Sequence, residues 1–219
     1  MKKSLAYTFA DEHLLRQALT HRSANGPNNE RLEFLGDAVL QVIVSDIVFM
    51  QKPEASEGQL SRLRSSVVRD VTLAEVALEL GLGEHVFLGS GERKSGGHRR
   101  ESILSDTLEA IFGAVYLDAG FDAARQVICT AYGDRLQNMP DGADLRDPKS
   151  RLQELLQGRG LALPVYAVEN VTGKAHKQSF EVSCTIPELE TASTGRGLTR
   201  RDAEQEAALA MLDAVDKIE

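Results

Sequence analysis

Two pairs of acidic residues occur at spacings that could support catalysis. Glu33 and Asp37 are four residues apart, and Asp106 and Glu109 are three apart, in segments that are otherwise mostly apolar. On a helix, residues three or four apart share a face, so each pair would present two carboxylates together. Because both segments are strongly apolar elsewhere, we expect these acids to point into a partly buried seam.

A partly buried group of carboxylates has a direct chemical use. Like charges repel and are costly to ionise away from water unless a cation neutralises them. Oxygen ligands select Mg²⁺ or Mn²⁺ over zinc, and such ions activate water and stabilise charge on a phosphodiester. Gly36 and Gly113 lie near the two acid pairs, so the missing side chains would let two helices approach closely around a metal. The alternative is that each pair is an ordinary solvated helix face.

From residue 14 to about residue 137 the sequence has a helical pattern. Three apolar series recur at spacings of three and four, as core-facing helices require. They are Leu32, Leu35, Val39, Val42, Ile43 and Ile47; Val67, Val71, Leu73, Ala74, Ala77, Leu78 and Leu80; and Ile103, Leu104, Thr107, Leu108, Ile111 and Val115. Gly81 and Gly83 should stop the second helix, and the third should end before Gly120. This half is predicted to be all-α.

The pattern changes after a break at 138–147, where proline, glycine and aspartate occur without periodicity. Asp147-Pro148 is a typical helix start, with a capping residue before proline at the first helical position. The elements expected after this helix are strands at 166–171, 180–186 and 189–194, and a final helix from Thr199 with Ala203, Ala207, Ala210, Met211 and Ala214 inward. The order α-β-β-β-α describes a small α+β module.

These patterns divide the chain into an all-α domain at 1–138, a linker at 139–146 and the α+β module at 147–219. The two cysteines, Cys129 and Cys184, fall in different domains and match neither a disulfide framework nor a metal-ligand pattern. We find neither a signal-peptide core nor an apolar run long enough to span a membrane. We therefore expect a cytoplasmic protein with reduced thiols and no membrane partner.

Three groups of polar residues in the α+β module have the chemistry to contact duplex RNA. They are Ser150, Gln153, Glu154 and Gln157 on one face of the first helix; Lys174 and His176 in the turn between the first two strands; and Arg200 and Arg201 at the start of the last helix. Short polar groups suit ribose 2′-hydroxyls in a minor groove, whereas arginines at a helix N-terminus attract phosphate. Each group alone is more often plain solvated surface.

The charge balance limits how RNA could be bound. The net charge is −8, and neither part is basic: residues 1–145 hold 15 Lys+Arg against 21 Asp+Glu, and residues 146–219 hold 10 against 12. Phosphate binding would therefore need local patches. One candidate is a basic loop at 93–100, whose alternative is an ordinary surface loop. Asp202 and Glu204, beside Arg200 and Arg201, would oppose phosphate.

Several motifs together resemble those of one family. Asn29–Asp37 (NERLEFLGD) resembles the signature of the bacterial ribonuclease III family, preceded by Ala18–Ser23 (ALTHRS). Gly91–Gly113 (GERKSGGHRRESILSDTLEAIFG) and the whole C-terminal module, which resembles a double-stranded RNA-binding domain, are also similar. The resemblance runs from about Leu14 to Val215.

The resemblance implies roles for the acids. Glu33, Asp106 and Glu109 would ligate Mg²⁺, with Mn²⁺ as a substitute. Asp37 and Glu109 would be the most critical for catalysis, and Asp37 acts either as a ligand or through a water of the metal. Two further acids match acidic positions near the family's cleavage site and would have supporting roles; they are Glu30 and Glu57.

The resemblance also implies a homodimeric endoribonuclease that cuts double-stranded RNA to leave 5′-phosphate and 3′-hydroxyl ends with short 3′ overhangs. Its substrates would be ribosomal RNA precursors and some messenger and transfer RNA precursors. Two other classes of function compete with this one. A protein that coats duplex RNA without cutting it would be favoured by the loss of one of the four acids, and none is lost. A metal phosphohydrolase of small nucleotides would need no RNA-binding module.

Overall fold

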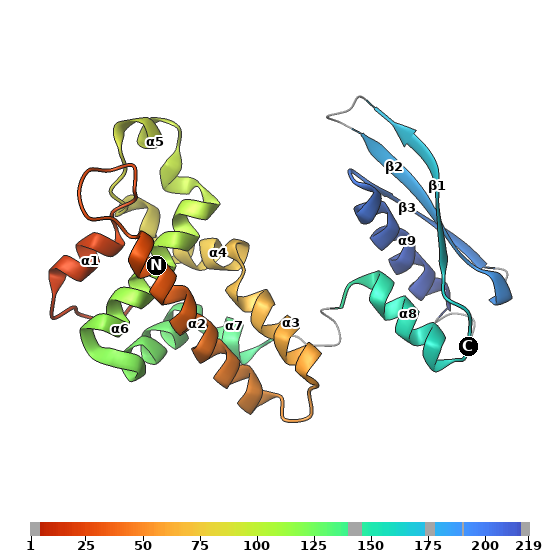
Figure 1. Ribbon diagram of the computed structural model, residues 1–219, viewed down its shortest axis with the longest axis horizontal. Helices are drawn as coiled ribbons and strands as arrows, with labels where there is room; N and C mark the ends of the chain where they lie inside the picture. Colours follow the sequence, from red (N-terminus) through yellow and green to blue (C-terminus); the bar gives the residue numbers. More distant parts are fainter. Residues whose placement is uncertain (1–4, 140–145, 174–177, 190, 216–219) are drawn as a thin grey trace. The chain divides into compact units, whose positions relative to one another are not determined.

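The computed structural model describes residues 5–139, 146–173, 178–189 and 191–215 (Figure 1). The chain forms two compact units, Met1–Leu145 and Arg146–Glu219. Most of the predicted linker, residues 140–145, lies outside the described residues, whereas Met139 at its start is buried. Among the described helices, none is both long and apolar enough to cross a membrane.

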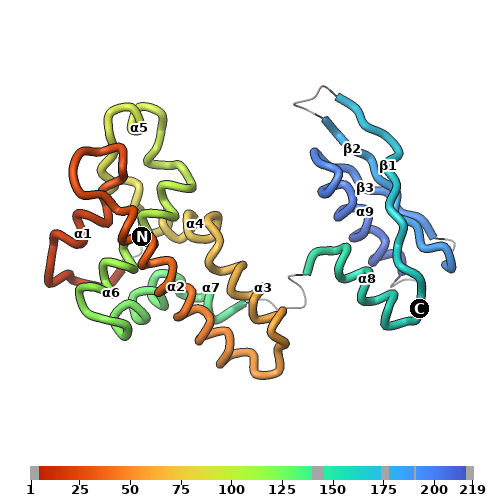
Figure 2. The backbone as a smooth tube through the Cα atoms, viewed as in Figure 1, coloured from red at the N-terminus to blue at the C-terminus, as the bar shows by residue number. Residues whose placement is uncertain are grey.

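The described part of the first unit is built from helices, as predicted. They are α1 (Glu12–Ala18), α2 (Glu30–Gln51), α3 (Glu57–Val68), α4 (Asp70–Leu80), α5 (Ser90–Lys94), α6 (Glu101–Tyr132) and α7 (Asp134–Gln137), with 3-10 turns at Leu82–Glu84 and Gly97–Arg99. Helix α6 packs against both α2 and α4, and its path past them can be followed in Figure 2. The core of the unit therefore surrounds the first half of α6, whose residues 103–105, 107–108 and 110–115 are all buried.

The crossing of α2 and α6 has no room for side chains at two glycines. A Cβ atom on Gly36 would overlap the carbonyl oxygen of Glu109 and come within 2.9 Å of the Gly113 nitrogen. A Cβ atom on Gly113 would overlap the carbonyl oxygen of Leu32. The close approach expected from these glycines is present, and it brings the backbones of the two acidic segments into contact.

Two expectations about these helices need correction, and one is confirmed. The series from Val67 to Leu80 belongs to two helices, because the backbone at Arg69 is extended (ψ 150°) and ends α3 before α4 begins. The predicted end of the third helix before Gly120 is confirmed: that residue has the non-helical angles φ 83° and ψ −172°, and a second helical segment follows it within α6 as far as Tyr132. Three apolar residues expected in the core are exposed instead, namely Val42, Val71 and Leu78.

The second unit has the predicted order of elements: α8 (Pro148–Gly158), β1 (Val165–Thr172), β2 (Ser179–Ile186), β3 (Thr191–Gly197) and α9 (Arg200–Val215). The sheet is antiparallel in the order β1-β2-β3, with a register irregularity between Val168 and Asn170. Asp147 caps α8 by accepting a hydrogen bond from the Ser150 backbone nitrogen. The inner face of β2 packs with both helices around Leu152, Leu156, Cys184, Ile186, Ala207 and Met211.

The third strand lies later in the chain than expected. Residues 187–189 form a 3-10 turn, and β3 extends through Gly195 and Gly197, which lie beyond the predicted strand at 189–194. Both glycines are needed in the strand, because a Cβ atom on either would run into the backbone of α9. Helix α9 also buries a slightly different stripe. Ala210 is exposed and Ala214 half-buried, whereas Ala208, Leu212 and Val215 are buried.

The crossing of α2 and α6 predicts the effect of one methyl group. Gly36→Ala should force the helices apart and destabilise the first unit by about 2–3 kcal/mol, because overpacking between backbones cannot be relieved by rotamer changes. Gly91→Ala is the matched control, since a Cβ atom there meets nothing within 4 Å. Urea denaturation of the whole chain measures both. Equal stability of the two variants would contradict the close crossing.

Candidate active site

Three carboxylates converge where α2 crosses α6. Glu33 comes from α2, and Asp106 and Glu109 come from α6; each offers an oxygen, and these oxygens all lie within 4.8 Å of one another. All three side chains are half-buried. Asp37, one turn beyond Glu33 on α2, is also half-buried and accepts a hydrogen bond from Gln41 Nε2 at 3.0 Å. We call Glu33, Asp106 and Glu109, with Asp37 beside them, the carboxylate cluster.

The electrostatics of the cluster are those of crowded like charges. Burial raises the pKa of Glu109 to about 8, and the charges of Asp37, Glu33 and Asp106 add to this effect. The pKa of Glu33 is raised by burial first and by the Asp106 charge second. Burial likewise raises the pKa of Asp106. Without a cation, the cluster therefore retains a proton on Glu109 at neutral pH.

Three residues that were not among the predicted site residues act electrostatically on the cluster. Asp70, the first residue of α4, is the strongest charge raising the pKa of Asp106 after burial itself, and it also acts on Glu109. His21 and Arg22 act in the opposite direction and lower the pKa of Asp106. His21 and Arg22 lie in the motif ALTHRS, so a signal was present. Asp70 had none, because only the packing of α4 against α6 brings it near.

The two acids predicted to have supporting roles lie in different surroundings. Glu30 begins α2, where Arg22 Nη1 approaches its carboxylate at 3.6 Å, and its charge contributes to the raised pKa of Glu33. Glu57 begins α3, is exposed, and accepts a hydrogen bond from Ser61 Oγ at 2.8 Å. Glu30 is therefore electrostatically linked to the cluster.

The predicted basic loop is largely structured. Arg93 and Lys94 end α5, and residues 97–99 form the 3-10 turn that follows. Arg100 pairs with Glu92 at 2.5 Å, so this arginine is partly neutralised. The side chains of Arg93, Lys94 and Arg99 remain exposed. From here on, the name basic loop covers residues 89–100, which are the predicted loop at 93–100 together with the rest of α5 and its N-cap residue Gly89.

In the second unit, the residues predicted to contact RNA fall on α8, in the turn between the first two strands and in the first turn of α9. On α8, Gln153, Glu154 and Gln157 are exposed, and Ser150 is half-buried, with its hydroxyl bonded to Asp147 at 2.7 Å. Glu154 forms an ion pair with Arg146. The two predicted residues of the strand turn, Lys174 and His176, lie outside the described residues.

The two acids expected to oppose phosphate have structural partners. Glu204 is mostly covered: its carboxylate accepts from Lys149 Nζ at 2.7 Å and from Arg200 Nε at 2.8 Å. Asp202 caps α9 through Thr199, whose nitrogen donates to the Asp202 carboxylate at 3.2 Å. The Glu204 charge is therefore matched by two cations, and Asp202 is used by the helix end. Arg201 is exposed beside them.

The donor set of the cluster fits a hard divalent cation. Its ligand atoms are carboxylate oxygens, which suit Mg²⁺ or Mn²⁺ far better than softer metals. Among the described residues, no lysine or arginine forms a salt bridge with Glu33, Asp106 or Glu109. The pKa of Glu109 is raised because these acids are held together, partly buried, without such a partner. A bound cation would remove that rise.

Comparisons with known proteins agree with this architecture. Residues 11–136 match the family described as Ribonuclease-III-like, and residues 148–215 match the double-stranded RNA binding motif. Ribonuclease 3 of Vibrio cholerae is 49% identical over 213 residues, which cover 97% of this chain and 95% of the relative. Ribonuclease 3 of Actinobacillus pleuropneumoniae is 53% identical over 208 residues, covering 95% and 93%.

A solved structure supports the first unit separately. The nuclease domain of ribonuclease III from Campylobacter jejuni, described for flexibility in a region involved in dimer formation, is 44% identical with a TM-score of 0.57. The match covers 58% of this chain and 90% of that one. A helical nuclease domain joined to a double-stranded RNA-binding domain defines a double-strand-specific endoribonuclease. Within that class, the chain belongs to the ribonuclease III family.

The raised pKa of Glu109 predicts how stability depends on pH without metal. Between an unfolded-state pKa near 4.5 and a folded pKa of about 8, the folded chain binds more protons than the unfolded chain. Stability should therefore fall as pH rises through this window. Glu109→Gln should flatten this slope and raise the melting temperature at pH 8 by about 2–4 °C, after allowance for solvent screening.

The measurement is thermal unfolding in a chelator from pH 5 to 8. Glu101→Gln, on the exposed first turn of α6, is the matched control and should follow the unmodified chain. Added Mg²⁺ should stabilise the unmodified chain more at pH 8 than at pH 5, because binding displaces the proton. A slope that is the same with and without Glu109 would contradict the electrostatic assignment.

Proposed function

We propose that this endoribonuclease hydrolyses duplex RNA with Mg²⁺ held by Glu33, Asp106 and Glu109, and that Mn²⁺ can substitute. The observation that carries this proposal is the approach of three carboxylate oxygens to within 4.8 Å in a partly buried seam. Mg²⁺ in such a site would activate water and stabilise charge on the phosphodiester. The products would carry 5′-phosphate and 3′-hydroxyl ends, with short 3′ overhangs.

The acids of the cluster have distinct tasks in this proposal. Burial and the neighbouring carboxylates together raise the pKa of Glu109 to about 8. Glu109 would therefore hold a proton when no metal is bound and release it when Mg²⁺ binds. Asp37 is oriented by Gln41 and faces the same cluster, which suits it to a ligand or to a water-orienting role. Glu30 adds negative charge at the rim, and Glu57 is retained as a supporting residue.

Binding of RNA is assigned to local groups, because the chain as a whole is acidic. On α8, Ser150, Gln153, Glu154 and Gln157 would contact 2′-hydroxyls in a minor groove. Arg200 and Arg201, in the first turn of α9, would bind phosphate with help from the helix N-terminus. Lys174 and His176 remain candidates for a second contact. The exposed cations of the basic loop would extend phosphate binding to the nuclease unit.

We also propose a homodimer formed through an exposed apolar stripe on α2. Phe34 is 80% exposed, Val42 57% and Phe49 66%. So many exposed large apolar side chains along one helix are unusual unless another surface covers them. Phe34 also borders a hollow of about 610 Å³ that includes Leu14, Leu35 and Leu117. A projecting ring beside an apolar hollow is self-complementary, as a twofold contact requires.

The cellular substrates proposed are ribosomal RNA precursors and some messenger and transfer RNA precursors, in the cytoplasm. The competing function, coating duplex RNA without cutting it, would leave the carboxylate cluster without a use. Intact acids at all four positions favour hydrolysis. A cleavage assay on labelled duplex RNA, with and without Mg²⁺, separates the two.

Glu109→Gln tests the active site directly. The change keeps size and shape but replaces a charged ligand with a weak neutral one, so single-turnover cleavage in Mg²⁺ should fall at least ~10³-fold. Duplex binding, measured in Ca²⁺ on the same RNA, should stay within a few-fold because the RNA-binding unit is untouched. Glu101→Gln on the same helix is the control.

The outcome with Mn²⁺ separates two roles of Glu109. Partial recovery of the rate in excess Mn²⁺ would indicate that the variant lacks metal affinity. No recovery would indicate that Glu109 also positions the attacking water. Near-normal cleavage by Glu109→Gln in Mg²⁺ would sink the proposed active site.

Phe34→Ser tests the dimer. Loss of a central aromatic contact from both copies of a twofold interface should raise the dimer dissociation constant at least ~100-fold, as measured by analytical ultracentrifugation. Leu78→Ser, which removes a side chain that is 56% exposed on α4, is the control and should leave the dimer intact. A dimer equally stable in both variants would place the interface elsewhere.

A further inference from the structure

The residues of the motif His21-Arg22-Ser23 form a junction between distant parts of the nuclease unit. Ser23 Oγ accepts a hydrogen bond from the Gly89 nitrogen at 2.9 Å and lies 2.8 Å from His21 Nδ1. The Ser23 nitrogen donates to the same Nδ1 at 3.1 Å, so this ring nitrogen is an acceptor. The His21 ring thus orients the hydroxyl that holds the first residue of the basic loop.

The contact at Gly89 is tight as well as bonded. A Cβ atom on Gly89 would overlap the Ser23 carbonyl oxygen and lie 3.3 Å from Ser23 Cβ. The backbone of Gly89, at φ −62° and ψ 159°, is one that any residue adopts. Glycine is therefore required at position 89 because the segment around Ser23 approaches its backbone so closely.

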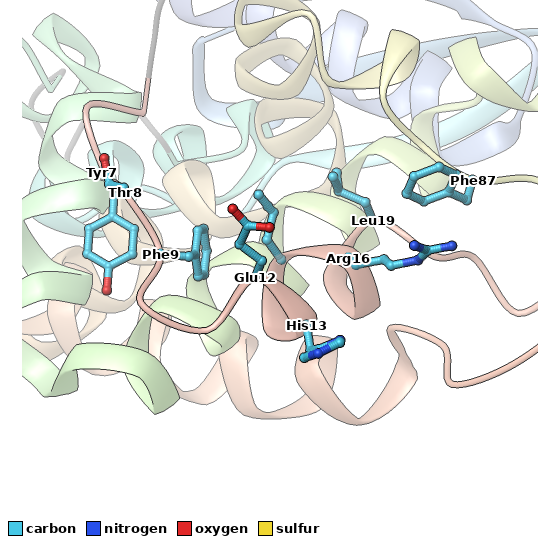
Figure 3. Close-up of a pocket in the computed structure, with 9 residues that line it drawn as sticks. Tyr7, Thr8, Phe9, Glu12, His13, Arg16, Leu19 and Phe87 are labelled. Atoms are coloured by element: carbon cyan, nitrogen blue, oxygen red, sulfur yellow. The ribbon is translucent and has the colours of Figure 1, made fainter.

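Phe87 fixes the chain just before this contact. Its nitrogen donates to the Leu19 carbonyl at 2.8 Å, and its carbonyl accepts from the His21 nitrogen at 3.0 Å. Its ring lies 5.7 Å from the Arg16 guanidinium, and Figure 3 shows Leu19, Arg16 and Phe87 grouped together. The segment that enters the basic loop is thus held at Phe87 and again at Gly89, on both sides of Leu88.

The same junction reaches the carboxylate cluster. The Asn29 nitrogen, at the start of α2, donates to the Thr20 carbonyl at 2.9 Å. Helix α2 then carries Glu33 one turn later. The charge of Arg22 also acts on Asp106, across the site on α6.

We propose that Ser23, oriented by His21, is a positioning residue that holds the basic loop at a fixed distance from the carboxylate cluster. RNA phosphates bound by Arg93 and Lys94 would then set which phosphodiester bond lies at the cluster. This inference rests on the proposed binding of RNA by the basic loop. Its physical basis is that misplacement of a bound substrate by about 1 Å can cost ~10²-fold in rate without any change in the reacting groups.

The test uses the whole chain and a duplex RNA with one defined cleavage site. Ser23→Ala should lower single-turnover cleavage about tenfold, the value of one lost hydrogen bond in positioning, and spread the cuts over neighbouring bonds. Gly89→Ala should do the same without altering Ser23, because its Cβ displaces the loop. Ser65→Ala is the control, since that exposed hydroxyl bonds to Ser61 within its own helix.

Thermal unfolding separates positioning from folding. Each variant should lose no more than about 4 °C in melting temperature, since the bond is exposed. A larger loss in melting temperature with cuts still confined to the original bond would mean a purely structural role and overturn the proposal.

A combined variant separates this inference from the function on which it rests. Arg93→Ala with Lys94→Ala should weaken RNA binding and flatten its salt dependence. Adding Ser23→Ala to that variant should then cost less than about twofold, because there is no longer a bound phosphate to position. A full further tenfold loss would overturn the positioning role alone. Unchanged binding and salt dependence in Arg93→Ala with Lys94→Ala would overturn the loop contact and the positioning role together.

Discussion

Helices α2 and α6 cross without side chains between them at Gly36 and Gly113, and the rest of the nuclease unit depends on that contact. The contact brings together Glu33, one turn before Gly36, and Glu109, one turn before Gly113, and the other two acids lie on the same helices. A larger residue at either glycine would separate the carboxylates by the width of a side chain. The same approach buries the apolar neighbours of the acids, so one crossing provides both the core and the charged seam.

The seam is stabilised by packing and destabilised by charge. The apolar residues of α2 and α6 that face the core are buried, and their burial offsets the repulsion among Glu33, Asp106 and Glu109. That repulsion is what gives the site its affinity for a cation, because a divalent ion relieves it. A site with fewer acids would leave the fold more stable and bind metal less well. Activity and stability therefore compete at these residues.

Net charge is a poor guide to this protein's partner. The chain is acidic overall, yet it presents exposed cations at the basic loop and in the first turn of α9, and Glu204 is neutralised by Lys149 and Arg200. From the sequence alone, Asp202 and Glu204 are expected to repel phosphate. In the folded unit, Asp202 caps a helix and Glu204 pairs with cations. Binding of a polyanion depends on which charges are left unpaired at the surface.

The sequence by itself determined the helical and α+β halves, the start of α8 at Asp147 and the acid pairs, because these depend on periodicity, local capping and spacing along one element. Tertiary structure alone decided that β3 runs through Gly195, where α9 leaves no room for a side chain. It also brought Asp70 to the carboxylate cluster and linked Ser23 to Gly89. Those contacts join residues far apart in the chain, and local patterns carry no record of which distant backbone a residue will meet.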